Sequence, residues 1–415
     1  MAQIIRRLLA SQGEVTEKRL RPAKPRKPLC ALLGIVFSLA CAAASSPLLG
    51  QDKLIAQASD LMRSGNFSQA EPIWRQLVKT YPNNPVFYGN LGVTLAQQGK
   101  LAAAVAEYQR SLKIKPGQAD VLSNLGIAEF KQGHFANAIA ALKKVAKQKP
   151  GDQRSTILIG MSYFGLRQYK DASESLKTAV QNSPSNLELR NVLAQSCLWS
   201  HQYDCALTQF QSILAVNPNA AQAHMLLAQA LDGMGKTEEA TRELEDVART
   251  SPQEPILHFE LGYLYYKQGE YEKASAELRQ EIANNPGYAQ SYLYLGDIAL
   301  HSNDDKSALE YLQKALQLQP ENRMAYFDLG CVYVNQNRDL DAVKAFQHAI
   351  RLDPSQPDAH YRLARVYTKL GQKQLAAQEL AKTKELHKKT EDTLIEKVSG
   401  EQPAQSTAPG PIIQR

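Results

Sequence analysis

Proline recurs along most of the chain at an interval of 34 residues, with no insertion or deletion between one occurrence and the next. At a background usage of about 5%, such a series in a single phase does not arise by chance. A fixed interval of this length is typical of an array that repeats one small structural element. The prolines are Pro82, Pro116, Pro150, Pro184, Pro218, Pro252, Pro286, Pro320 and Pro354.

Two further positions keep the same interval and hold only small side chains. The first is always alanine: Ala70, Ala104, Ala138, Ala172, Ala206, Ala240, Ala274, Ala308, Ala342 and Ala376. The second is alanine or glycine: Ala58, Gly92, Gly126, Gly160, Ala194, Ala228, Gly262, Gly296, Gly330 and Ala364. Small side chains at these places predict that two helices cross closely in every repeat, because a long side chain would hold them apart.

Each repeat is predicted to form two amphipathic helices joined by a short turn. In residues 85–118, apolar residues such as Leu91 and Leu95 follow helical spacing up to Gly99, and a second helix continues through Tyr108. Gly99 suits the turn because glycine accepts a positive φ. Pro116 then ends the second helix, since proline has no N–H to donate and disfavours helical geometry in the residue before it.

This pattern resembles the tetratricopeptide repeat family, in which 34-residue units form antiparallel helix pairs. The resemblance implies an all-α fold, a right-handed superhelical α-solenoid of stacked antiparallel helix pairs. It covers ten repeats, and because no repeat covers its own apolar face, neighbours stabilise one another. The repeats are residues 51–84, 85–118, 119–152, 153–186, 187–220, 221–254, 255–288, 289–322, 323–356 and 357–390.

The turn between the two helices departs from glycine in four repeats. Asn303 and Asn337 still accept a positive φ, whereas Arg167 and His201 predict a different turn in repeats four and five. Glu129 stands where other repeats have an apolar or small residue, and Phe130 beside it is expected to take over the packing. Glycine occupies the other turns: Gly65, Gly99, Gly133, Gly235, Gly269 and Gly371.

The excess of positive charge lies at the amino terminus. Residues 1–50 carry a net charge of +6, and the other 365 residues carry 40 basic against 39 acidic groups. A body so close to neutrality does not indicate a nucleic-acid partner. The uncharged stretch 28–51 follows the basic residues, which is the order of a secretory signal with a short linker. We therefore expect an exported chain, periplasmic or extracellular.

Two other interpretations of this leader stay open. An uncleaved segment would anchor the chain in the membrane, and this is the only membrane contact expected. Cys41 would be lipid-anchored if the leader were a lipoprotein signal, although Ser38 replaces the leucine that such signals favour three places earlier. At the other end, residues 391–400 are predicted to form a helical cap, and residues 401–415 a disordered tail.

Three cysteines lie outside the leader: Cys197, Cys205 and Cys331. Cys197 and Cys205 belong to opposite helices of repeat five near the turn, and an exported compartment permits a disulfide between them. Two buried thiols are the alternative, because geometry decides the matter. The absence of any CxxC in the sequence argues against structural zinc.

The sequence contains no set of residues with catalytic spacing. His224, His258 and His360 share the fourth position of their repeats, so their spacing is that of the fold, and we expect them to pack or to lie on the surface. No phosphate-binding glycine loop or nucleophile motif occurs in it. We therefore expect no enzyme activity, no cofactor and no metal.

In the family that the array resembles, the first helices line a concave groove that holds extended peptides or partner helices. The groove positions are the second, sixth, ninth, twelfth and thirteenth of each repeat. The residues predicted to bind a partner there are Asn90, Asn124, Tyr263, Tyr266, Tyr294, Asp297, Asp328, Arg362 and Arg365, with Glu260, Lys267 and Lys369 on the same face. By contrast, Tyr265, Tyr271, Tyr333 and Tyr367 are in phase with the core.

Rigid aromatic side chains beside mixed charges are typical of interface hot spots. A two-carboxylate clamp for chaperone tails is not present, because Ile55 and Ser59, or Gly89 and Val93, stand where such a clamp needs Lys and Asn. The predicted function is a non-enzymatic protein–protein interaction scaffold. The alternative is a non-catalytic arm or accessory subunit of a cell-envelope enzyme or a secretion or assembly complex. RNA-reading helical repeats are disfavoured by the near-neutral charge.

Overall fold

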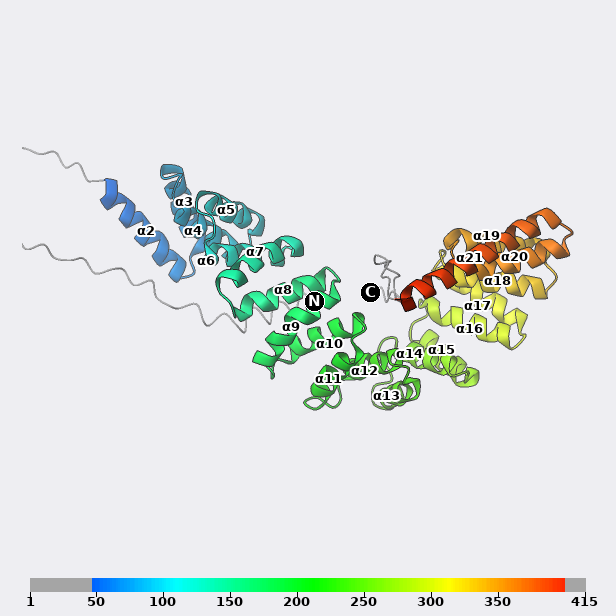
Figure 1. Cartoon of the computed structure of the whole chain (residues 1–415). Helices are drawn as coiled ribbons and strands as arrows, with labels where there is room; N and C mark the ends of the chain where they lie inside the picture. The colour runs from blue at the N-terminus through cyan, green and yellow to red at the C-terminus, as the bar shows by residue number, and fades with distance from the viewer. Residues whose placement is uncertain (1–46, 400–415) are drawn as a thin grey trace, which may run out of the picture. The chain divides into compact units, whose positions relative to one another are not determined.

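A computed structural model describes residues 47–399, and within this range the chain folds into twenty α-helices without a strand (Figure 1). The helices are α2 (Pro47–Arg63), α3 (Phe67–Thr80), α4 (Pro85–Gln97), α5 (Leu101–Ile114), α6 (Ala119–Lys131), α7 (Phe135–Gln148), α8 (Gln153–Gly165), α9 (Tyr169–Asn182), α10 (Leu187–Trp199), α11 (Tyr203–Leu214), α12 (Ala221–Gly233), α13 (Thr237–Thr250), α14 (Leu257–Lys267), α15 (Tyr271–Asn284), α16 (Ala289–His301), α17 (Asp305–Leu318), α18 (Arg323–Asn335), α19 (Asp339–Leu352), α20 (Pro357–Lys369) and α21 (Lys373–Ser399). The predicted all-helical array of stacked pairs is confirmed.

The chain divides into two bodies, of which the first ends at Gly233 and the second begins at Met234. In the N-terminal body, α2–α12, the first helices from α2 to α10 pack against the second helix of their own repeat, and those from α4 to α12 pack against the second helix of the repeat before. The C-terminal body, α13–α21, follows the same rule. First helices also contact the first helices of adjacent repeats, α4 with α6 and α14 with α16 for example. In each body, the side of the first helices that faces away from the second helices forms a surface that we call the first-helix face of that body.

In the first nine repeats, the recurring proline lies just beyond the end of the second helix. Helix α3 ends at Thr80, two residues before Pro82, and α5 ends at Ile114, two residues before Pro116. The next first helix begins soon after, and in several repeats a side chain caps it. The side-chain oxygen of Asn84 accepts a hydrogen bond from the backbone N–H of Val86 at 3.0 Å. Proline and cap together fix where one repeat ends and the next begins.

The expectation of a different turn at Arg167 and His201 is wrong. Both residues adopt the positive φ that glycine adopts elsewhere, 59° and 58°. The reason is the hydrogen bonding at the helix end. The N–H of Gln168 donates to the carbonyl of Tyr163 at 2.9 Å, just as the N–H of Lys100 donates to Leu95 at 3.0 Å in a glycine turn. The packed helix pair imposes this turn whatever residue occupies it.

The small positions lie in the contact between the paired helices. Every alanine of the first series is buried, and Ala138 has no exposed surface. At the second position, a Cβ built on Gly126 would lie 2.6 Å from Cγ of Leu142, closer than carbon atoms pack. The lack of a side chain at Gly126 therefore lets the first helix rest directly on Leu142 of the second.

The side chain of Glu129 is buried at the apolar position of repeat three. Its carboxylate lies 2.8 Å from Nδ1 of His134 and accepts a longer hydrogen bond, 3.4 Å, from the amide of Asn137. Phe130 is also buried and contacts Phe135 edge to face, so it supplies apolar packing at this turn. A polar residue is tolerated here because a neighbouring side chain satisfies it.

The last helix, α21, runs without interruption to Ser399, so residues 391–399 continue the second helix of repeat ten instead of forming a separate one. The predicted leader and the predicted tail lie outside the described residues. Within residues 47–399, no helix has both the length and the apolar character that a membrane span requires.

Candidate functional site

A regular register relates adjacent repeats on the first-helix face. The ninth residue of one repeat lies beside the sixth residue of the next, as the rings of Tyr263 and Tyr294 show with centroids 5.4 Å apart. Asp297 and Asp328 occupy the same two positions one repeat further on, and Cys331 and Arg362 occupy them after that. The face of the C-terminal body therefore presents aromatic, acidic and basic side chains in turn.

In the N-terminal body, the structure brings Asn90 and Asn124 together in one open pocket of about 510 Å³. We call it the amide pocket. It lies between α4 and α6, and its lining consists of Val86, Gly89, Asn90, Val93, Val121, Asn124 and residues 115–120. The nearest neighbour of a Cβ placed on Gly89 would be Val121, at 3.5 Å. Because glycine has no side chain, position 89 leaves the pocket open towards Val121.

The two amides of this pocket have no protein partner. Neither the Asn90 nor the Asn124 side chain makes a hydrogen bond to another part of residues 47–399, and both are partly exposed. Val86 at the rim is 56% exposed. Amide groups that each offer a donor and an acceptor, set among valines, match the groups of an extended peptide.

In the C-terminal body, the three tyrosines predicted to bind a partner pack against one another. The centroid of the Tyr294 ring lies 5.1 Å from that of Tyr266 and 5.4 Å from that of Tyr263. Phe259 and Tyr288 complete the cluster, with centroids 4.9 Å apart. All three tyrosines retain partial exposure. Burial raises the pKa of Tyr294 to about 12, with further contributions from the charges of Tyr263 and Asp297.

The two predicted acidic residues are more buried than residues of an exposed contact surface. Asp297 is 6% exposed and Asp328 is 3% exposed. Oδ2 of Asp297 accepts a hydrogen bond from the hydroxyl of Tyr266 and lies 3.6 Å from Nε2 of His301. Oδ2 of Asp328 is buried without any hydrogen-bond partner in the described part of the chain. Both predicted acidic residues are therefore nearly buried, and a tyrosine of the preceding repeat is hydrogen-bonded to Asp297.

The electrostatics of Asp328 follow from this burial. Desolvation raises the pKa of Asp328 to about 8, and the negative charge of Asp297 adds to the rise, while Arg323 lowers it and Asp358 raises it. Burial also raises the pKa of the Cys331 thiol to about 12, so this free cysteine is not an activated nucleophile. We call Tyr263, Tyr266, Tyr294, Asp297 and Asp328 together the aromatic–acidic face.

The predicted basic contacts Arg362 and Arg365 are exposed on α20. They occupy the sixth and ninth positions of repeat ten. The charge of Arg362 lowers the pKa of the Cys331 thiol one repeat earlier, against the larger effect of burial. Lys369 on the same helix instead donates to Asn337 and pairs with Asp339 at 2.8 Å. Its role is thus to join two repeats.

The four tyrosines expected in the core differ in burial. Tyr265 and Tyr367 are buried, whereas Tyr271 and Tyr333 are partly exposed. The histidines at the fourth position make structural contacts. His258 and His360 are buried, each with Nδ1 2.6 Å from a glutamate of the second helix, Glu277 or Glu379. Nε2 of His224 lies 2.9 Å from the carbonyl oxygen of Pro218.

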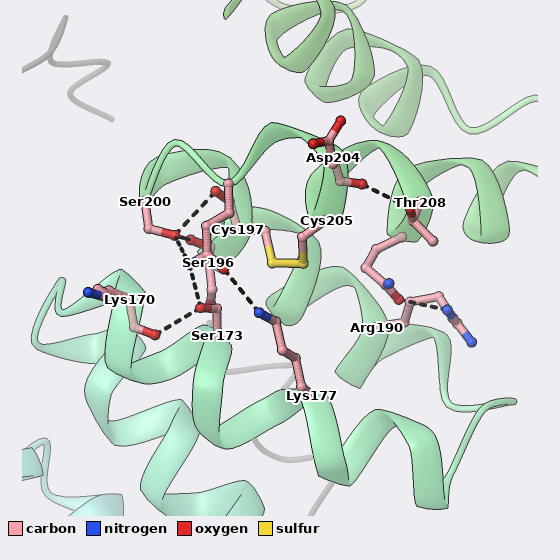
Figure 2. The surroundings of a disulfide bond; sticks show 12 residues. Lys170, Ser173, Lys177, Arg190, Ser196, Cys197, Ser200, Asp204, Cys205 and Thr208 are labelled. Atoms are coloured by element: carbon pink, nitrogen blue, oxygen red, sulfur yellow. Dashed lines mark hydrogen bonds between the residues drawn. A yellow bond between two sulfur atoms is a disulfide. The ribbon is translucent and has the colours of Figure 1, made fainter. Parts of the chain in front are cut away.

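Cys197 and Cys205 form a disulfide that joins α10 to α11, with 5.8 Å between their Cα atoms (Figure 2). Beside it, the hydroxyl of Ser200 donates to the carbonyl of Ser196 at 2.7 Å, which closes the end of α10. Of the two alternatives left open by the sequence, the structure contains the bond.

The contact that this disulfide makes recurs in other repeats. Cys197 and Cys205 stand at the eleventh and nineteenth positions, where repeat three has Glu129 and Asn137, which are hydrogen-bonded. Repeat seven has a tyrosine there, with the ammonium of Lys273 5.0 Å from its ring centroid. The disulfide is therefore the covalent form of a contact that the fold already makes.

Sequence reasoning missed several residues of both surfaces. Phe259 and Tyr288 belong to the aromatic cluster, and Val86 and Gly89 belong to the amide pocket. Phe259 and Gly89 share the fifth position of their repeats, which lies beside the sixth on the same helix. Twelve of the eighteen tyrosines lie between residues 255 and 370, and this clustering is the sequence signal for the first of these surfaces.

Within the range 47–399, no three His, Cys, Asp or Glu side chains are grouped so as to hold a metal ion. The arrangement on the first-helix face offers hydrogen-bonding amides, aromatic rings and buried carboxylates. These groups suit recognition of a polypeptide.

No curated protein sequence matches the chain. Among solved structures, it is similar to MamA from Desulfovibrio magneticus RS-1, at 24% identity over 41% of this chain and 96% of that one, with a TM-score of 0.38. Yeast Tom70 matches at 13% identity over 86% of this chain and 96% of that one, with a TM-score of 0.40. YrrB, described as a TPR protein with an unusual peptide-binding site, matches at 18% over 44% and 95%, with a TM-score of 0.40.

Models of the tetratricopeptide repeat match most of the described part of the chain. They cover residues 55–119, 259–323, 95–159, 163–230, 332–371, 358–390 and 221–246. These matches agree with the helix pairs, the small buried positions and the turns described above. The chain belongs to the tetratricopeptide repeat family.

Proposed function

We propose that this chain is an exported, non-enzymatic scaffold that binds an extended segment of another protein along its first-helix face. Tetratricopeptide repeats generally bind proteins or peptides, and membership of the family supports a scaffold of this kind. The finer parts of the proposal are the place of binding, the extended form of the segment and the export of the chain.

The amide pocket is the observation that carries the place of binding. Its two asparagine amides come from successive repeats and have no partner within residues 47–399, although both lie in a recess between two helices. A peptide group presents one N–H donor and one C=O acceptor. An asparagine side chain can accept from the N–H through its oxygen and donate to the C=O through its nitrogen. An extended segment across α4 and α6 would meet both amides and place an apolar side chain among the valines.

Export is supported by two independent features. The order of basic, uncharged and small residues in the leader is that of a secretory signal. The disulfide between Cys197 and Cys205 is a bond that persists in oxidising compartments and is rare in the cytosol. A chain that carries both is expected to work outside the cytoplasm.

Photocrosslinking in the native cell tests the place of binding. A benzoylphenylalanine would replace Val86 at the rim of the pocket, and in a control it would replace Asn182, which is exposed at the end of α9. We expect a discrete protein adduct from position 86 and none from position 182. The double substitution Asn90→Ala and Asn124→Ala should reduce the adduct at least about tenfold, as the loss of two hydrogen bonds predicts.

Three outcomes would contradict the proposal. One is equal labelling from positions 86 and 182, and another is an adduct whose yield does not depend on Asn90 and Asn124. The third is the absence of any adduct from position 86. Substitution of Asn182 by alanine serves as the matched change, since it removes the same amide from an exposed place remote in sequence.

A further inference from the structure

We propose that Asp297 and Asp328 receive a lysine or arginine side chain of the bound segment, with Tyr263, Tyr266 and Tyr294 beside it. The inference rests on the proposed function, because it assumes that a polypeptide lies along the first-helix face. It adds the chemistry of the ligand at one place in the C-terminal body.

Asp328 is the residue that indicates a missing cation. It is 3% exposed, its Oδ2 is buried, and no hydrogen bond or ion pair reaches its carboxylate from the described residues. A buried carboxylate without a partner is costly, and native structures rarely leave one. Asp297 stands at the adjacent position of the preceding repeat and adds a second negative charge. No cation from the described residues pairs with Asp328, so in the free protein only a proton neutralises this carboxyl group.

The basic side chain of the chain that lies near Asp328 is already engaged. Arg323 pairs with Asp358 through one terminal nitrogen, and its guanidinium lies 5.7 Å from the ring centroid of Phe327. Its Nε is buried without a partner. Arg323 lowers the pKa of Asp328 electrostatically but makes no ion pair with it. Arg323 therefore leaves Asp328 without an ion pair from the described residues, and we assign that role to a cation of the bound segment.

The aromatic rings make this place selective for a cationic side chain with an apolar stem. Tyr294 lies one repeat before Asp328 and packs against Tyr263 and Tyr266 of the repeat before that, and all three retain partial exposure. Aromatic faces attract guanidinium and ammonium groups and also cover the methylene carbons of arginine and lysine. A divalent metal ion would gain nothing from these rings. Charge complementarity and ring lining together favour a basic side chain of a protein segment.

The next positions along the face limit the charge of the segment. Arg362 and Arg365 are exposed on α20, one and two places further along the same register. They would repel a run of basic residues. We therefore expect an isolated basic residue, flanked by apolar residues towards the tyrosines and by acidic residues towards the arginines.

Binding of a cation should be coupled to ionisation of Asp328. The groups that face Asp328 are Asp297, Arg323, Asp358 and Cys331. With a pKa of about 8 in the free protein, Asp328 is largely protonated at neutral pH. A bound cation favours the carboxylate, so binding releases the proton to solvent. Affinity should accordingly rise with pH up to about 8 and then level off.

The first test selects random heptapeptides displayed on phage against the full chain, in parallel with Asp328→Asn and with Glu272→Gln, an exposed acidic residue of α15. We expect peptides with a single lysine or arginine from the native chain and from Glu272→Gln, and loss of that preference with Asp328→Asn. Enriched peptides without a basic residue would overturn this inference and leave the proposed function standing. No enrichment at all would overturn both.

The second test measures a selected arginine peptide against the same peptide with citrulline, which keeps the shape and removes the charge. Calorimetry at neutral pH in buffers of different ionisation enthalpy reports the protons released. We expect the arginine peptide to bind at least about tenfold more tightly, as for a hydrogen bond to a charged group. Release of about one proton per peptide is expected from the native chain and none from Asp328→Asn. Equal binding of both peptides, or proton release that persists in Asp328→Asn, would refute the assignment.

Discussion

Tyr266 donates a hydrogen bond to Asp297, and this bond joins the first helices of two successive repeats, α14 and α16. Burial, followed by the hydrogen bond and the charge of Asp297, raises the pKa of Tyr266, so its phenol remains a donor well into the alkaline range. The bond has two consequences. It couples the stability of the two repeats, and it holds one carboxylate of the aromatic–acidic face in place.

Removal of this hydroxyl should destabilise the C-terminal body. Tyr266→Phe leaves the buried Asp297 carboxylate without its donor, and a cost of about 1–3 kcal/mol in the free energy of unfolding is expected. Tyr294→Phe is the matched control, because the Tyr294 hydroxyl makes no hydrogen bond within residues 47–399. Urea denaturation followed by circular dichroism measures both. Equal effects of the two substitutions would show that the bond contributes nothing.

The buried carboxylate of Asp328 should make stability depend on pH. Its pKa rises from 3.8 to about 8 on folding, so the folded chain binds this proton more tightly than the unfolded chain. Its contribution to stability is therefore full below about pH 4 and is lost as the pH rises to about 8. Asp328→Asn removes the ionisation, so its stability relative to the native chain should increase over the same range.

Denaturation at a series of pH values checks this expectation. Glu321→Gln provides the comparison, since Glu321 is exposed in the turn before α18 and its substitution should give a nearly constant difference. A pH-independent difference for Asp328→Asn would mean that the carboxylate is not buried as described.

The close crossing in repeat three should not accept a larger side chain. Ala138 has no exposed surface, and Ala138→Leu should overpack the contact between α6 and α7 at a cost of about 1–3 kcal/mol. Ala140→Leu makes the same change two residues later on the exposed side of α7 and should be nearly neutral. Thermal denaturation of both variants distinguishes them. A neutral Ala138→Leu would indicate that the helices are not in direct contact there.

The turn at Arg167 should be stabilised by glycine. Arg167 has a φ of 59°, which costs a residue with a Cβ about 1–2 kcal/mol. Arg167→Gly relieves this cost, partly offset by the greater freedom of glycine in the unfolded chain, and a net gain of about 0.5–1 kcal/mol is expected. The reverse change in the preceding repeat, Gly133→Arg, should destabilise by a similar amount. Destabilisation by Arg167→Gly in chemical denaturation would contradict this account.

The helix pairs were predictable because their signals are local. A proline ends a helix through its own ring and missing N–H, and a small residue marks a crossing wherever it recurs. The turns between the helices were less predictable from the sequence. Arg167 and His201 were expected to differ from glycine because only their own preferences were considered, whereas the helices on both sides impose the conformation.

The candidate site was predictable in position but not in depth. The repeat register placed Asn90, Asn124, Tyr294 and Asp328 on one face, yet it did not reveal that Asp328 is nearly buried. Depth depends on the side chains of the neighbouring repeats, and those contacts are not local in sequence. The disulfide was undecidable for a similar reason, since the distance between Cys197 and Cys205 is set by how closely α10 and α11 pack.

The bond between Cys197 and Cys205 also limits how far the chain can be drawn out under tension. In a linear array each helix pair contacts only its neighbours, so the pairs can separate one after another. Cys197 and Cys205 are eight residues apart in the sequence. While the disulfide is intact, their Cα atoms remain 5.8 Å apart even when the chain is pulled. An extended backbone spans about 3.3–3.6 Å per residue, so the fully extended oxidised chain is roughly 20 Å shorter than the reduced chain. Reduction of the disulfide would release this length.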